Sequence, residues 1–156
     1  MVLKYIRLVC WWIGLFIVSL LISYVSQNEV TTWYPTLEKS SLTPPPYVFG
    51  PVWSVLYLLI GISGWLLWES VNVYNQDTLK VLFRCQLYLN WLWTPLFFGM
   101  QAPGLSLICI LMLIVFVCLF IIKSVKTLWA SAVLLMPYLA WILLAAYLNL
   151  YIWLYN

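Results

Sequence analysis

Charged residues divide this chain into uncharged runs that are long enough to cross a lipid bilayer. Residues 8–28, 40–68 and 85–122 form runs of 21, 29 and 38 residues, and no charge follows Lys126. A helix crosses the hydrocarbon with about 20 mostly apolar residues. The run of 38 is too long for one helix, and its segment GMQAPG, residues 99–104, is typical of a turn that divides it in two.

The predicted fold is therefore all-α, an integral membrane bundle of five transmembrane helices in a single domain, residues 1–156. The helices are expected at about 5–25, 47–68, 79–98, 105–122 and 128–150, with an outer loop over 26–46. The first helix is interpreted as retained rather than as a cleaved signal peptide. Its apolar stretch exceeds the usual core of about 7–15 residues, and no A-x-A-like site follows it.

Composition agrees with a membrane protein and excludes other classes. The chain is 66% hydrophobic and 7% charged, whereas an average soluble domain is about 45–50% apolar and about 25% charged. A soluble chain of this length buries only roughly two thirds of its surface and could not hide so much apolar area. An ordinary soluble enzyme, a disordered chain and a nucleic-acid-binding module are excluded, and the lipid bilayer is the expected partner.

The basic residues predict the orientation in the membrane. With five spans, one side carries the N-terminus and the second and fourth loops, and it holds six of the seven basic residues, while the other side holds Lys39 alone. Basic residues collect on the cytoplasmic side of membrane proteins. The N-terminus is therefore expected in the cytoplasm, and these six charges are interpreted as topological signals rather than as an anionic ligand site.

The chain offers no familiar catalytic or metal-binding set of residues. It has no histidine, and its four cysteines, all within predicted spans, suggest neither a disulfide framework nor a zinc site. There is no Ser/His/Asp arrangement and no pair of carboxylates inside a span. Neither a metal nor a required cofactor is predicted, and acid–base catalysis has no candidate residues.

Two features inside the predicted bundle leave alternatives open. The loop at 26–46 contains four prolines that argue against a long helix, yet it also carries Trp33, Tyr34 and Leu37. It is either an anchor at the membrane interface or a lid packed over the helices. In the third span, Gln86 and Asn90 lie one turn apart on one face. Hydrogen bonding between helices is favoured over contact with a ligand.

Four tryptophans lie deeper than the usual interfacial belt. With a rise of about 1.5 Å per residue, Trp53 lies roughly 10 Å below the outer surface, Trp91 and Trp93 roughly 8–10 Å, and Trp141 roughly 13 Å. All four would line the outer half of the bundle beneath the loop. They predict either an aromatic pocket for a large planar apolar molecule or simple packing between helices.

Three stretches of the sequence resemble the translocator protein family, also called tryptophan-rich sensory proteins or peripheral-type benzodiazepine receptors. They are WYPTLEK, PP and FGPVWSVLY at 33–39, 44–45 and 49–57, then QLYLNWLW and FFG at 86–93 and 97–99, then PYLAW and LN at 137–141 and 148–149. The matches fall in order and cover most of the chain, and the family also has five spans.

The resemblance implies a homodimer that binds tetrapyrroles such as protoporphyrin IX, and in some members haem, sterols or synthetic drugs. Residues at family pocket positions, or within the matched motifs, are the ligand-binding candidates: Trp33, Tyr34, Pro45, Trp53, Asn90, Trp93, Tyr138, Trp141, Ala145 and Leu148. The tryptophans matching Trp53 and Trp141 are linked in some bacterial members to light-dependent porphyrin breakdown, so these two are the candidate catalytic residues if such a reaction occurs.

The chain departs from the family pattern at several positions. Ser40 replaces a usual proline after the loop lysine, Leu105 stands where animal members have a tryptophan that contacts the ligand, and Cys109 stands where an aspartate is frequent. The C-terminal stretch lacks the basic residue of the family's sterol motif. Tight sterol or drug binding is therefore not predicted. Without histidine, free-base porphyrin is a more suitable ligand than haem.

Three functions remain open from the sequence. The first is porphyrin binding for sensing, transport or scavenging, the second is light-dependent porphyrin degradation, and the third is a regulatory scaffold without a tight small-molecule ligand. The short chain is typical of a bacterial cytoplasmic membrane, and a mitochondrial outer membrane is the alternative.

Overall fold

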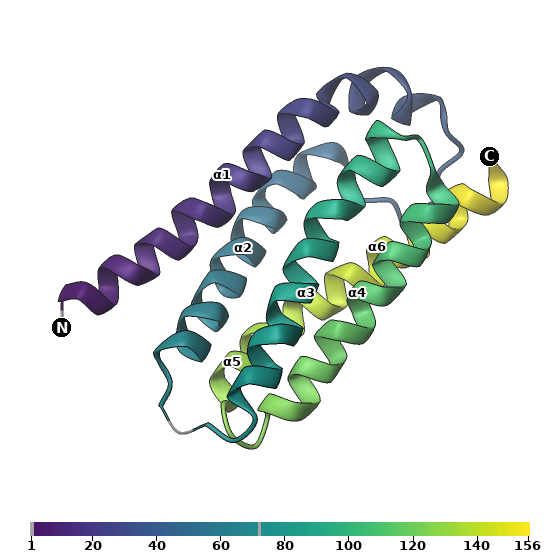
Figure 1. Ribbon diagram of the computed structural model, residues 1–156. Helices are drawn as coiled ribbons and strands as arrows, with labels where there is room; N and C mark the ends of the chain where they lie inside the picture. Colours follow the sequence, from purple (N-terminus) through teal and green to yellow (C-terminus); the bar gives the residue numbers. More distant parts are fainter. Residues whose placement is uncertain (1, 72) are drawn as a thin grey trace.

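The computed structural model describes residues 2–71 and 73–156, and within them it contains helices and no strand. The elements are α1 (Val2–Thr32), the 3-10 helix η1 (Tyr34–Thr36), α2 (Pro46–Glu69), α3 (Gln76–Thr94), the π-helical turn η2 (Pro95–Gly99), α4 (Pro103–Ser124), α5 (Trp129–Leu134) and α6 (Met136–Tyr155). Because α5 and α6 form one interrupted helix, the described chain is a bundle of five helices (Figure 1).

The bundle confirms the predicted all-α membrane class. Helices α1, α2 and α4, together with the α5–α6 unit, are each long and apolar enough to cross a membrane. Helix α3 falls short of that hydropathy because it carries Lys80, Arg84, Gln86 and Asn90. It packs along α4, and the two helices run side by side in Figure 1. The polar helix α3 is therefore accommodated in the bundle by packing along the apolar helix α4.

Helix α1 continues past the predicted boundary at residue 25. The prediction of a loop from 26 is wrong for residues 26–32, which are helical up to Thr32. This segment is polar, but its first proline is Pro35, so no missing N–H or ring clash stops the helix earlier. The hydroxyls of Thr31 and Thr32 also donate to the carbonyl of Asn28 within the same helix. The loop is therefore shorter than expected.

Proline also explains how α3 ends. The predicted helix at 79–98 begins three residues earlier, at Gln76, and changes at Pro95 into η2. A proline inside a helix removes one backbone donor and crowds the preceding turn, and here the turn widens until the Met100 N–H donates to the Pro95 carbonyl at 2.9 Å. The turn expected at 99–104 is confined to 100–102, since Pro103 already opens α4.

The last predicted span is interrupted near Pro137. In place of one helix at 128–150, α5 and α6 meet at Leu135, two residues before Pro137. Pro137 has no N–H to donate to the preceding turn, and the Leu135 N–H instead closes a tighter turn onto Ala132 at 3.2 Å. Helix α6 then continues to Tyr155, five residues beyond the prediction.

Two glycines of α2 allow its neighbours to approach closely. A Cβ at Gly61 would collide with the indole of Trp12 on α1, and a Cβ at Gly64 would lie 2.8 Å from the Phe83 ring on α3. The Trp12 indole also donates to the Leu58 carbonyl at 3.2 Å. Small residues at such crossings let membrane helices pack by van der Waals contact, so Gly61 determines how α1 lies on α2.

We predict that Gly61→Val destabilises the bundle by about 1–3 kcal/mol, the usual effect of overpacking, because the valine displaces Trp12. Thermal unfolding in detergent, followed by tryptophan fluorescence, measures the change. Gly14→Ala on α1 is the control, since nothing lies within 4 Å of a Cβ there. Equal stability of Gly61→Val and the wild type would contradict this account of the α1–α2 contact.

Candidate functional site

The half of the bundle beneath the 33–45 loop contains a cavity of about 1510 Å³. Its lining comes from α1, the 33–45 loop, α2, the end of α3 with η2, α4 and α6. Small-molecule pockets usually measure about 300–1,000 Å³, so this cavity has room for a ligand the size of a tetrapyrrole. Eight of the ten predicted ligand-binding residues line it: Tyr34, Pro45, Trp53, Asn90, Trp93, Trp141, Ala145 and Leu148.

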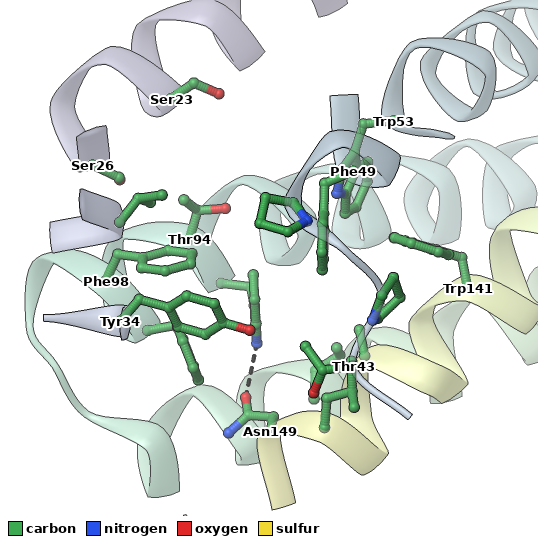
Figure 2. A pocket seen from close by; sticks show the side chains of 18 of the residues that line it. Ser23, Ser26, Tyr34, Thr43, Phe49, Trp53, Thr94, Phe98, Trp141 and Asn149 are labelled. Atoms are coloured by element: carbon green, nitrogen blue, oxygen red, sulfur yellow. Dashed lines mark hydrogen bonds between the residues drawn. The ribbon is translucent and has the colours of Figure 1, made fainter. Parts of the chain in front are cut away.

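Aromatic rings form two opposite walls of the cavity. Figure 2 shows Tyr34 and Phe98 on one side and Phe49, Trp53 and Trp141 on the other. The Tyr34 and Phe98 ring centroids are 5.6 Å apart, and those of Phe49 and Trp141 are 5.7 Å apart. Each wall is therefore an edge-to-face aromatic cluster. A flat apolar molecule placed between the walls would bury its faces against them.

A chain of three buried hydrogen-bonding groups meets the cavity at Asn90. The Tyr57 hydroxyl donates to the Asn90 side-chain oxygen at 2.9 Å, and the Asn90 amide nitrogen donates to the Tyr138 hydroxyl at 2.8 Å. Asn90 lines the cavity, whereas Tyr138 is completely buried behind it. The polar face of α3 thus connects helices through Asn90, as predicted, and the same amide also faces the cavity.

Both tyrosines also support the cavity wall from behind. The Trp53 ring centroid lies 5.4 Å from that of Tyr57 and 6.5 Å from that of Tyr138. Tyr138 therefore acts on the cavity by positioning Trp53 and Asn90. Trp33, the other predicted residue outside the lining, packs against Phe97 of η2 at 5.6 Å. It lies at the base of the loop.

Gln86, the partner of Asn90 on the same helix face, lies elsewhere. Its side chain is completely buried away from the cavity lining, and no described residue forms a hydrogen bond with its amide. The expectation of hydrogen bonding between helices is therefore confirmed for Asn90, and among the described residues it is not met for Gln86. The structure gives no protein partner for Gln86 among residues 2–71 and 73–156.

Asn149 is a cavity residue that the sequence predictions did not include. Its side-chain oxygen accepts from the Trp93 indole and from the Ser106 hydroxyl, both at 3.0 Å, and its amide nitrogen donates to the Pro103 carbonyl at 2.7 Å. Figure 2 shows this side chain projecting from α6 with a hydrogen bond to its oxygen. One side chain thus connects α3, α4 and α6. The one sequence feature that could have indicated Asn149 is that a polar amide lies within an otherwise apolar span.

The loop that follows η1 lies over the cavity and is attached to α6. The Ser40 and Tyr147 hydroxyls lie 3.1 Å apart. The Glu38 N–H donates to the Asn156 side-chain oxygen at 2.8 Å, and the Asn156 amide donates back to the Glu38 carbonyl at 3.2 Å. The placement favours the lid interpretation over that of an interfacial anchor, because residues 34, 35, 39 and 43–45 all face the cavity.

A second space lies against the first. A groove of about 620 Å³ runs between α2 and α6 and is lined by Pro51, Val52, Val55, Leu56, Pro137, Ala140, Trp141 and Leu144. Trp141 and Leu144 also line the cavity. These two side chains therefore separate the interior cavity from the groove.

The fold and the site define a small multi-pass membrane protein with an aromatic, ligand-sized cavity inside an all-α bundle. Within that class the chain belongs to the TspO/MBR family, whose sequence model matches residues 10–154. It is 44% identical over 134 residues to the tryptophan-rich protein TspO of Archaeoglobus fulgidus, covering 86% of each chain. It is 34% identical over 128 residues to the human translocator protein, covering 81% of this chain and 76% of the human one.

Related sequences are also found in bacteria. Protein CrtK of Rhodobacter capsulatus is 35% identical over 130 residues, covering 80% of this chain and 78% of that one. The family membership confirms the resemblance noted in the sequence. It also agrees with the integral membrane fold.

We predict that Asn149→Leu destabilises the bundle by about 1–3 kcal/mol, because the partly buried Trp93 indole N–H then has no acceptor. Ser106 keeps its second acceptor, the Pro103 carbonyl at 3.0 Å. Thermal unfolding in detergent measures the loss, with the exposed Asn28→Leu on α1 as the matched control. Equal midpoints for the two variants would show that Asn149 does not hold the three helices together.

Proposed function

We propose that this protein binds tetrapyrroles, with free-base protoporphyrin IX as the model ligand, for porphyrin sensing, transport or scavenging. The observation that carries the proposal is the cavity of about 1510 Å³ between two aromatic walls. A porphyrin is flat, apolar over both faces and larger than most ligands. Stacking and burial of apolar area are the interactions that such walls supply. Other planar apolar molecules of similar size are the alternative ligands.

A light-dependent breakdown of the bound porphyrin is the second candidate. The observation that favours it is that Trp53 and Trp141, the two candidate catalytic residues, both line the same cavity. An indole beside an excited porphyrin is an oxidisable neighbour, and the reaction would use dioxygen as the oxidant. It would need no acid–base set. The regulatory scaffold is the outcome if neither binding nor breakdown is observed.

The proposal also specifies how the protein is oriented in the membrane and which membrane holds it. The basic residues Lys4, Arg7, Lys80, Arg84, Lys123 and Lys126 belong to the bundle end opposite the lid, where Arg7 pairs with Glu69 at 2.8 Å. With the N-terminus in the cytoplasm, the cavity opens toward the outer side. We propose a homodimer in a bacterial cytoplasmic membrane, with the mitochondrial outer membrane as the alternative.

We predict saturable binding of protoporphyrin IX to the detergent-solubilised protein, at micromolar concentration. The double variant Trp53→Phe, Trp141→Phe should bind about tenfold more weakly, because each smaller ring loses contact area, and about 1.4 kcal/mol corresponds to a factor of ten. A titration followed by the porphyrin absorbance measures both affinities. The exposed Trp129→Phe on α5 is the matched control. Binding no better than that of empty micelles would refute the proposal.

Illumination of the complex separates a binder from a degrading enzyme. If the second candidate holds, the wild type consumes porphyrin under light and air faster than lipid-dispersed porphyrin bleaches. Trp53→Phe and Trp141→Phe should each slow that loss by tenfold or more at saturating porphyrin. Chromatography of the products distinguishes a defined product from general bleaching. Equal rates with and without protein would leave binding as the function.

A further inference from the structure

The cavity contains one charged side chain, and it is a cation. Among the described residues that line the cavity, the rest are aliphatic, aromatic or uncharged polar, and Lys39 alone carries a charge. The two acidic residues nearby in the sequence, Glu29 and Glu38, do not line it. Within residues 2–71 and 73–156, the ion pair that the structure shows is Arg7–Glu69, which does not involve the lid. Lys39 therefore has no counter-ion in the part of the chain described.

The loop holds the Lys39 ammonium by neutral groups only. Its Nζ donates to the carbonyls of Tyr34 at 2.8 Å, Leu37 at 2.9 Å and Pro35 at 3.3 Å, and lies 4.9 Å from the centre of the Tyr34 ring. These contacts satisfy the three N–H donors without neutralising the charge. The result is a positive charge fixed at the rim of an apolar cavity.

One of these hydrogen bonds is suited to exchange. The bond to Pro35 is the longest of the three and is exposed, while the bonds to Tyr34 and Leu37 are partly buried. A carboxylate arriving from the cavity can take the place of the Pro35 carbonyl, which remains free to bond with water. A charge-assisted hydrogen bond of this kind is stronger than a neutral one. Low polarity in the cavity strengthens the attraction further.

We propose that Lys39 makes the cavity selective for planar apolar ligands that carry a carboxylate at one edge. The flat body would lie between the aromatic walls, and the carboxylate would pair with the Lys39 ammonium beneath the lid. This inference rests on the proposed tetrapyrrole function and specifies it. It selects porphyrins with free acid side chains over their neutral esters, whose ring systems have the same shape and stacking faces.

The test compares protoporphyrin IX with its dimethyl ester, each titrated into full-length protein in a neutral detergent with empty micelles as the blank. We expect the wild type to bind the diacid about tenfold more tightly than the ester. Lys39→Met should lose this preference while keeping its affinity for the ester within twofold. Lys39→Arg should retain a preference for the diacid, and Lys126→Met, which removes an exposed charge away from the cavity, should match the wild type.

The outcomes separate this inference from the function on which it rests. Equal affinity of the wild type for diacid and ester overturns the role of Lys39 while porphyrin binding stands. If Lys39→Met weakens both ligands alike, Lys39 acts only by holding the lid, and the selectivity proposal is overturned. If neither ligand binds the wild type above the micelle blank, porphyrin binding itself fails. High salt should reduce the preference of the wild type for the diacid without changing its affinity for the ester.

Discussion

Two buried asparagines provide the hydrogen bonds on which the cavity-containing half of the bundle depends. Lipid tails are as apolar as leucine, so burial of apolar area does little to hold membrane helices together. Asn90 joins the hydroxyls of Tyr57 and Tyr138, and Asn149 joins the Trp93 indole to the start of α4. Both amides lie at the cavity, so the same bonds that hold the helices in register also fix the walls in place.

Proline gives the bundle its irregular outline near the cavity. The widened turn after Pro95 carries Phe97 and Phe98 under the lid, where their rings contact Tyr34. The break before Pro137 separates α5, which packs on α2, from α6, which packs on α4. A regular helix at Pro95 would orient Phe97 and Phe98 differently, and a regular helix at Pro137 would do the same to Trp141. The cavity is therefore a consequence of where the backbone loses its regular hydrogen bonds.

The sequence predicts the spans well because charge is so rare in it, and the gaps between charges are visible without a structure. It fails at residues 26–32, where polar side chains suggested a loop although the backbone could remain helical. Asn149 is visible in the sequence as an amide within an apolar span, but its partners come from the separate helices α3 and α4, and no local pattern reveals them. For the same reason, the sequence motifs could name Tyr138 but could not show that it stands behind Trp53 rather than in the cavity.

The position of Trp141 has a consequence for how a ligand of the proposed kind would enter and leave the cavity. Its indole, with Leu144, is the partition between the interior cavity and the groove that α2 and α6 form on the outside of the bundle. Exchanging the indole for a methyl group would join the two spaces and give a compound dissolved in the bilayer a sideways route that avoids the loop. Such a variant would change residence time and affinity by different amounts. The opened route to the lipid would shorten the time that a ligand stays, and the lost contact with the ring would weaken its affinity.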